Sequence, residues 1–503
     1  MVFIDLNLGC KIIDKVSQSI KKTNEHSSHL NIYVDVDTGH LTFIMPVTLY
    51  NTIYAMKAQT PTLSPLQPSL KALLPFAVFL LLFLGTGIAL TLKGIDFAFY
   101  QLPASIAIIP AIFVAIYLGN RHSKVNVNTQ IEQFIRGAGH SNIVTMCIIY
   151  LLAGAFAVVA KATGSVDASV QLGLAIFPNY LLLPGLFIVA ALLSTAMGSS
   201  MGTIAAIAPI ALGFIDSAGL DAALVAGCLV SGAIFGDNLS IISDTTIAST
   251  RSQGAHMKDK FKVNIKFALP AALICLVIFT VLGNEVNHEF VNDAALVGLI
   301  PYIVILVLAL LGINVFVILT LGIILAAAIG MLTNGYQLTV WISDINKGFA
   351  SMQDIFILAL FIGGLSELVR QQGGLAALTQ AIATLAQKIS PNNKKRASGL
   401  GIAGLAFTCN FFTANNTVSI IISGDTAKNL ATDGELLPAE SASLLDVFAC
   451  INQGLLPYGA QALLLGATLN ISPLAVASHA FYPMILFFVA GLSFWRLTRQ
   501  KEV

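Results

Sequence analysis

Charged side chains are scarce in this chain. Lys, Arg, Asp and Glu make up 10% of its 503 residues, and the formal net charge is +1. Charges so few and so balanced provide no basic surface for nucleic acid, which excludes a nucleic-acid partner. Apolar residues make up 56%, and the mean hydropathy is +0.84. Such a chain needs lipid to cover its surface, and the length of its apolar runs selects helices as the structure that satisfies every backbone polar group in lipid.

Paired cysteines and the common catalytic motifs are also missing. The cysteines are scattered without CxxC spacing, so we expect small core residues and neither disulfides nor metal ligands: Cys10, Cys147, Cys228, Cys275, Cys409 and Cys450. No HExxH or P-loop string occurs, and Asp237 lacks the GxGD context of an intramembrane aspartyl protease because Ile234 precedes Phe235. We predict that the chain is not an enzyme and needs no cofactor besides the ions that it moves.

Residues 1–70 contain no apolar run long enough to cross a bilayer and no secretory signal. We predict a polar N-terminal extension on the cytoplasmic side, in which the alternation of residues 30–50 favours a small strand hairpin. Met56 is an alternative start, because lysines would then flank the first span directly. The predicted transporter domain covers residues 71–497, and residues 498–503 form a cytoplasmic tail.

From residue 72 onward, apolar stretches recur at about the 20 residues that a bilayer requires. They predict an all-α polytopic membrane protein with about 10–12 transmembrane segments. Uninterrupted spans are expected near residues 72–92, 99–119, 142–160, 264–283, 294–311, 313–332, 353–370 and 475–496. Two longer regions, 181–250 and 398–470, are apolar but punctuated by clustered Gly, Ser, Thr, Asn and Asp, which predicts broken helices or re-entrant hairpins.

Basic residues predict which ends of the spans face the cytoplasm. They gather after the second span, after the first interrupted region, before the second one and at the C-terminus: Arg121, His122, Lys124, Arg136, Arg251, Lys258, Lys260, Lys262, Lys394, Lys395, Arg396, Arg496, Arg499 and Lys501. Loop 284–293 has none, and loop 333–352 has only Lys347. On this count the first interrupted region runs from outside to inside and the second from inside to outside. The two regions are therefore predicted to be inverted repeats, the organisation of secondary transporters whose broken helices meet near the bilayer midplane.

Polar clusters inside the interrupted regions supply the candidate ion and substrate ligands. In the first region these are Ser199, Thr203, Asp237, Asn238, Ser240, Ser243, Asp244, Thr245 and Thr246. In the second region they are Asn410, Thr413, Asn415, Asn416, Thr417, Asp446 and Gln453.

The chemistry of these clusters suits a hard cation. Na⁺ prefers carboxylate, hydroxyl, amide and carbonyl oxygens, all of which are present, and Asp237 and Asp244 are the predicted Na⁺ ligands. An ionised, unpaired carboxylate inside a membrane is costly, so a proton and Na⁺ compete for it, and that competition is sufficient for exchange. The two aspartates would share a face of a continuous helix, but Gly236 and the polar run after it predict a break.

The string GDNLSIISDTT at residues 236–246 resembles the GDKLSPLSDTT signature of the NhaC-type Na⁺/H⁺ antiporters of the ion transporter superfamily. The string STAMGSSMGTIAAIAPIA at residues 194–211 resembles that family's STGTSWGTIAAIAPIA segment. The resemblance covers roughly residues 70–497 and implies an inverted-repeat fold, Na⁺/H⁺ exchange and matching roles for Asp237, Ser240, Ser243, Asp244, Thr245 and Thr246. Two positions depart from the signature: Asn238 stands where the better-known members have Lys, and Ile241 stands where they have Pro.

The substrate has an alternative. Members of the resembled family also carry organic acids and amino acids with sodium, so a sodium-coupled amino-acid or carboxylate transporter of the same fold is the second hypothesis. The expected partners are the lipid bilayer, Na⁺ and H⁺, and a small organic solute and a homodimer are left open. The expected location is the inner (plasma) membrane of a bacterial cell, with many passes and a cytoplasmic C-terminus. Glu367 and Arg370 are predicted to form a local i, i+3 pair.

Overall fold

The computed structural model describes residues 67–95, 98–122, 124–176, 178–283 and 296–497, together with three short strands near the N-terminus. The chain divides into two compact units, Met1–Leu66 and Gln67–Val503. Predictions for Cys10, Met56, loop 284–293 and tail 498–503 lie outside the described residues.

The first unit contains a small antiparallel sheet. Its middle strand β3 (Leu41–Ile44) pairs with β1 (Phe3–Ile4) on one side and β2 (Asn31–Val34) on the other. The β2–β3 pair agrees with the hairpin that the alternation of residues 30–50 predicts.

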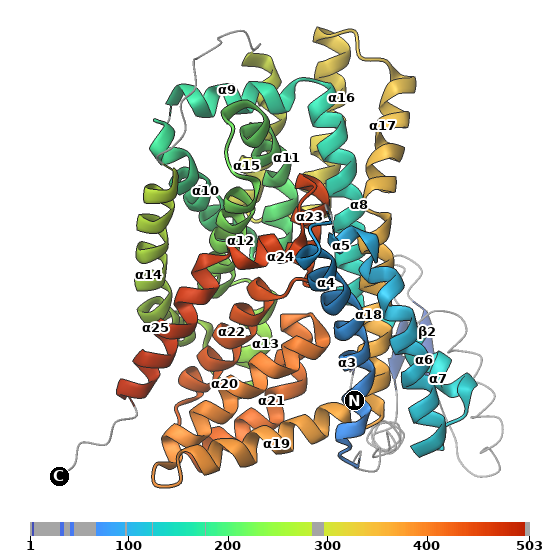
Figure 1. Cartoon of the computed structure of the whole chain (residues 1–503), viewed down its shortest axis with the longest axis vertical. Coiled ribbons are helices and arrows are strands. Elements are labelled where there is room, and N and C mark those ends of the chain that lie inside the picture. Colours follow the sequence, from blue (N-terminus) through green and yellow to red (C-terminus); the bar gives the residue numbers. More distant parts are fainter. Residues whose placement is uncertain are drawn as a thin grey trace. The chain divides into compact units, whose positions relative to one another are not determined.

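The second unit is made of helices, as Figure 1 shows. Before the first interrupted region these are α3 (Leu74–Leu80), α4 (Thr86–Leu92), α5 (Ala98–Gln101), α6 (Ala104–His122), α7 (Val127–Ala138), α8 (Ser141–Ala162) and α9 (Ser165–Ile176). The interrupted regions contain α10 (Leu182–Met197), α11 (Ser200–Ala218), α12 (Ala222–Leu239) and α13 (Asp244–Gln253), and α20 (Lys394–Thr413), α21 (Asn416–Asp433), α22 (Pro438–Leu455) and α23 (Ala460–Leu469). The others are α14 (Met257–Leu282), α15 (Ile300–Leu310), α16 (Val315–Thr333), α17 (Leu338–Ser351), α18 (Gln353–Gln371), α19 (Gly374–Ile389), α24 (Pro473–Ser478) and α25 (Phe481–Leu497).

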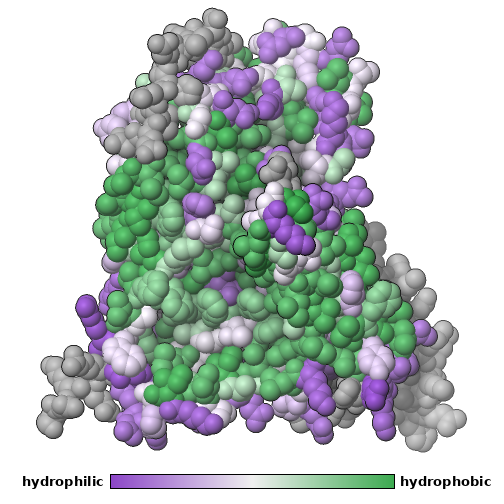
Figure 2. All heavy atoms as spheres, in the orientation of Figure 1, coloured by the Kyte–Doolittle hydropathy of each residue, from purple (hydrophilic) through white to green (hydrophobic). Residues whose placement is uncertain are grey.

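The length and surface of these helices suit a bilayer. Among the described residues, seven helices are long and apolar enough to cross a membrane, or eight if α17 and α18 count as one bent span. Shorter apolar helices cover Leu182–Met197, Val297–Leu310 and Phe481–Arg496. Figure 2 shows hydrophobic residues over the middle of the unit's visible face and hydrophilic residues at its upper and lower ends. The chain is a multi-pass helical membrane protein.

Two segments predicted as loops are helical. Most of 333–352 forms α17, which leads into α18 with a bend of 44°. Helix α14 begins at Met257 and not near residue 264, so Lys258, Lys260 and Lys262 belong to its first turns. The prediction that Lys260 is a cytoplasmic flanking charge is wrong: its side chain is 1% exposed because it pairs with Asp446 inside the protein.

Smaller predictions agree with the structure. Glu367 and Arg370 form the expected i, i+3 ion pair, with 2.6 Å between Oε1 and Nη2. The cysteines within the described residues are free and buried: Cys147, Cys228, Cys275, Cys409 and Cys450.

The first breaks of the two interrupted regions have the same backbone geometry. After α10, Gly198 is left-handed (φ +66°) and Ser199 is extended (φ −150°, ψ 112°) before α11 begins. After α20, Ala414 is left-handed (φ +48°) and Asn415 is extended (φ −147°, ψ 111°) before α21 begins. We call α10–α13 the first repeat and α20–α23 the second repeat.

The second breaks also correspond. Helices α12 and α22 each have 18 residues, and α13 and α23 each have 10. Ala414 follows Gly198 by 216 positions, and the same offset of 216 relates Ala222 to Pro438 and Asp244 to Ala460. The two repeats therefore match residue by residue across both breaks.

The repeats pack against each other around an approximate two-fold relation. Helix α11 contacts α23, its counterpart α21 contacts α13, and the equivalent helices α12 and α22 contact each other, as an isologous interface requires. In Figure 1, α10, α11 and α12 lie in the upper part and α13 in the lower part, whereas α20, α21 and α22 lie in the lower part and α23 in the upper part. The predicted inverted repeats are present.

Candidate functional site

The breaks of both repeats border one small pocket of about 90 Å³. Its lining consists of Asn142, Thr145, Met146, Ile149, Gly198, Ser199, Ser200, Met201, Asp237, Ser243, Asp244, Thr245, Ala414, Asn415, Asn416, Thr417, Gln453 and Gln461. A water molecule takes up about 30 Å³ of liquid, and pockets for drug-sized ligands start at about 300 Å³. The space therefore suits a partly hydrated ion or a very small solute.

Asp237 is held at the pocket by close packing of α12 on α10. A Cβ on Gly236 would lie 2.3 Å from the Cβ of Ser194, so only glycine permits this approach. The Ser194 hydroxyl donates to the Ala233 carbonyl across the same contact, at 2.6 Å. Asp237 itself is 4% exposed, and its Oδ1 accepts the Ser200 N–H at 2.9 Å. Because Ser200 is the first residue of α11, the positive end of that helix faces the carboxylate.

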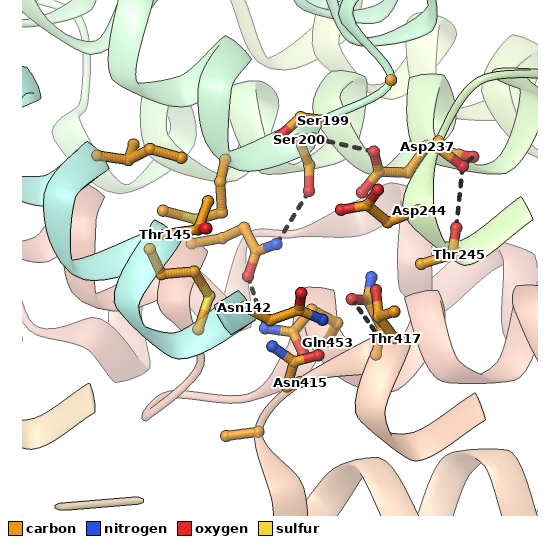
Figure 3. A pocket seen from close by; sticks show the side chains of 18 residues that line it. Asn142, Thr145, Ser199, Ser200, Asp237, Asp244, Thr245, Asn415, Thr417 and Gln453 are labelled. Carbon is orange, nitrogen blue, oxygen red and sulfur yellow. Dashed lines mark hydrogen bonds between the residues drawn. The ribbon is translucent and has the colours of Figure 1, made fainter. Parts of the chain in front are cut away.

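Asp244 reaches the same pocket from the other side of the predicted break. It is the first residue of α13, and its side chain is exposed toward the pocket. Ser243 caps α13 by accepting the Thr246 N–H at 3.2 Å, and its hydroxyl lies 3.3 Å from the Asp237 carbonyl oxygen. Figure 3 shows both carboxyl groups on one side of the pocket. The break thus turns two aspartates of one motif into a buried and an accessible carboxylate.

The second repeat contributes amides where the first has acids. The Gln453 Nε2 donates to the Gln461 Oε1 at 2.8 Å, and the Gln461 Nε2 donates to the Ser200 Oγ at 3.0 Å. These bonds connect the second repeat to the residue that holds Asp237. The Gln453 Oε1 is buried without a hydrogen-bond partner, which leaves an oxygen free to bind a cation.

The break after α20 adds three more polar residues. Asn415 caps α21 by accepting the Val418 N–H at 3.0 Å. The Asn416 Oδ1 accepts the Thr417 N–H at 3.0 Å, and its Nδ2 lies 3.8 Å from the Cys450 Sγ. Figure 3 shows Asn415 and Gln453 across the pocket from the two aspartates.

Helix α8 closes the pocket with residues that the sequence did not single out. Asn142 and Thr145 lie on its first turns, and Thr145 is exposed. Their signal was weak, because a lone amide and a lone hydroxyl at the start of an apolar span are ordinary features of membrane helices. Gln461 was missed for the same reason.

Several predicted site residues do not line the pocket and instead support its walls. The Thr203 hydroxyl bonds the Ser199 carbonyl within its own helix, at 3.0 Å. The Asn410 Nδ2 donates to the Ala449 carbonyl at 2.7 Å, and the Thr413 hydroxyl donates to the Asn415 carbonyl at 3.1 Å.

The remaining residues of the signature also point away from the pocket. The Ser240 carbonyl accepts the Thr246 hydroxyl at 2.8 Å, which closes the loop between α12 and α13. The Asn238 Nδ2 lies 3.4 Å from the Tyr482 hydroxyl.

Asp446 is fully buried but is not a pocket residue. Its Oδ2 lies 2.7 Å from the Nζ of Lys260 and accepts the Asn264 Nδ2 at 2.9 Å. A buried carboxylate with a buried ammonium partner is already neutralised. The structure therefore gives the place predicted for Asp446 to an internal ion pair.

Comparisons with known proteins agree with this architecture. The sequence model described as the Na⁺/H⁺ antiporter family matches residues 41–284 and 288–495. The malate-2H(+)/Na(+)-lactate antiporter of Bacillus subtilis is 26% identical, over 79% of this chain and 90% of the relative. The Na(+)/H(+) antiporter NhaC of Bacillus subtilis is 25% identical, over 69% of this chain and 83% of the relative. The solved YdaH transporter of Alcanivorax borkumensis is 15% identical with a TM-score of 0.38, over 85% of this chain and 98% of that one.

Proposed function

The chain belongs to the Na⁺/H⁺ antiporter family and is a secondary transporter of Na⁺ and H⁺, and we propose that the exchange takes place in the pocket between the two repeats. Asp237 and Asp244 are the carboxylates that Na⁺ and H⁺ occupy in turn. The observation that carries this proposal is the convergence of a buried and an accessible carboxylate, both from one broken helix, on a cavity of about 90 Å³. No enzymatic step and no cofactor is needed for such exchange.

The geometry supports competition between the two ions. With Na⁺ bound, the Asp237 and Asp244 carboxylates, nearby hydroxyls and the free Gln453 oxygen provide hard oxygen ligands. Without Na⁺, two ionised carboxylates in so small a space repel each other, and protonation relieves that repulsion. One ion leaves only when the other arrives, so the gradients of the two ions are coupled.

The pocket is proposed to open toward the cytoplasm in this conformation. Its accessible wall includes Thr145 on the first turns of α8, which directly follows α7 with its basic Arg136. Basic ends mark the cytoplasmic side of spans, and on the same ground we place the C-terminus in the cytoplasm. The bacterial relatives support a location in the bacterial inner membrane.

The test is ²²Na⁺ uptake into proteoliposomes that hold an imposed pH gradient. We expect uphill Na⁺ movement, a half-saturating Na⁺ concentration that rises as the pH falls, and loss of movement in Asp237→Asn. Asp216→Asn, which removes an exposed partner of Lys161, is the matched control. Downhill Na⁺ leakage that ignores the pH gradient would instead identify a channel.

A second candidate is coupled transport of a small carboxylate. The amides of Asn415, Asn416 and Gln453 and the first residues of α11 and α21 line the half of the pocket away from the acids, and helix N-termini favour anions. The name of the malate-2H(+)/Na(+)-lactate antiporter supports the same idea. Adding lactate or malate on the opposite side in the same assay separates the candidates: Na⁺ movement that requires the acid favours solute exchange, and movement without it favours Na⁺/H⁺ exchange.

A further inference from the structure

A buried lysine next to the signature is used by neither carboxylate of the pocket. Lys260, on the first turn of α14, is 1% exposed, and its Nζ lies 2.7 Å from the Asp446 Oδ2 and 2.6 Å from the Thr246 Oγ1. Thr246 is the last residue of the signature string GDNLSIISDTT. The ammonium therefore connects α14, α13 and α22 at the broken helix that carries Asp237.

The signature itself lacks its usual cation. Asn238 stands where the resembled sequences have lysine. Its side chain is 1% exposed, and its Oδ1 has no hydrogen-bond partner. Position 238 is thus a buried site on α12 with an unsatisfied oxygen and no charge.

Position 238 and Lys260 serve the same carboxylate. The Asn264 Nδ2 donates both to the Asn238 backbone oxygen, at 2.7 Å, and to the Asp446 Oδ2, at 2.9 Å. Two oxygens that share one donor are close neighbours, and the four-carbon stem of a lysine at position 238 would cover that separation. The Oδ1 of Asp446 is buried and still without a partner, so the carboxylate has room for an ammonium on a second side.

We infer that Lys260 supplies from α14 the positive charge that the resembled signature carries at position 238. In this place it neutralises Asp446 and keeps that carboxylate out of cation exchange, so that Asp237 and Asp244 alone provide the exchangeable charge. Lys260 is a positioning residue: it holds Thr246 and Asp446 and does not line the pocket.

A charge swap tests this inference. Lys260→Asn leaves Asp446 buried and unpaired, and Asn238→Lys places two lysines around one carboxylate, so each single variant should lower exchange at least about tenfold and lower the unfolding temperature in detergent. Asn238→Lys with Lys260→Asn should restore the exchange rate to within about threefold, with the wild-type pH dependence of the half-saturating Na⁺ concentration. Lys262→Asn, on the same helix but exposed, is the control for loss of a lysine.

Two outcomes overturn the inference. One is a double variant no better than the worse single variant in both unfolding temperature and exchange. The other is restoration by Asn238→Met with Lys260→Asn, because then side-chain volume and not charge is what the cluster needs. The transport part rests on the proposed function, but the unfolding temperatures do not: a wild type without Na⁺/H⁺ exchange would refute that function while the stability cycle still tests the relocated charge.

Discussion

Asp237 and Gln453 occupy equivalent positions in the two repeats, each three residues before the residue that ends its helix, Ser240 in one and Leu456 in the other. Both side chains line the same pocket. The two-fold relation therefore places an acid opposite an amide, and the negative charge of the site comes from one repeat only. The first repeat provides the charge that attracts a cation, and the second provides neutral oxygens.

This asymmetry predicts the effect of Gln453→Glu. A third carboxylate around the pocket should lower the half-saturating Na⁺ concentration by about tenfold, or about 1.4 kcal/mol, and slow the maximal rate because Na⁺ leaves less readily. Initial rates of ²²Na⁺ uptake against Na⁺ concentration measure both. Gln380→Glu, on the exposed face of α19, should change neither, and an unchanged Na⁺ dependence in Gln453→Glu would argue against this side of the pocket as an ion ligand.

The two pocket aspartates should differ in their effect on stability. Asp237→Asn and Asp244→Asn should each reduce pH-driven Na⁺ uptake at least about tenfold, because each removes an exchangeable charge. Asp237→Asn should not lower the unfolding temperature, since it removes a buried charge while an amide oxygen can still accept the Ser200 N–H. Thermal unfolding in detergent beside the uptake assay decides the matter, and a destabilised Asp237→Asn would mean that the carboxylate is chiefly structural.

The equivalent residues Gly198 and Ala414 predict opposite effects of opposite substitutions. Gly198→Ala places a Cβ at φ +66° and about 3.0 Å from the Ile242 side chain, so it should destabilise by about 1–2 kcal/mol. Ala414→Gly relieves the same strain at φ +48° and should stabilise by about 1 kcal/mol. Unfolding temperatures of the two variants test the pair, and shifts in the same direction would contradict the equivalence of the breaks.

The accessible wall of the pocket predicts which side of the membrane reaches it. Thr145→Cys should react with a membrane-impermeant thiol reagent in inside-out vesicles and react at least about threefold more slowly with saturating Na⁺, because the ion occupies the adjoining space. The native cysteines within the described residues are buried, and Cys10 is replaced by Ser in the background. Lys258→Cys, exposed at the start of α14, should react at the same rate with and without Na⁺. Reaction of Thr145→Cys only from the opposite side would reverse the proposed orientation.

The sequence predicted the spans, the broken helices and the inversion because these depend on local composition. Clusters of polar residues inside otherwise apolar stretches have few structural solutions in a bilayer. For this reason Ser199, Asp237, Asp244, Asn415 and Gln453, chosen from such clusters, come together at one pocket.

What the sequence did not reveal depends on contacts between distant segments. Lys260 looks like the lysines around it, and only its contact with Asp446 on α22 distinguishes it. The register of the repeats is also hidden, since the offset of 216 aligns Thr203 with Ser419 and not with the similar Thr417. The equivalence lies in backbone angles and helix lengths, which very different side chains can share.

The constant offset between the repeats has a consequence for the rest of the transport cycle. Because each residue of one repeat has a defined counterpart in the other, the opposite-facing form of this protein can be constructed by giving each repeat the conformation that the other one has now. In that form α23 would take up the arrangement of α13, and the wall now closed over the pocket would become its mouth. One conformation of this chain thus contains the template for both ends of its journey across the membrane.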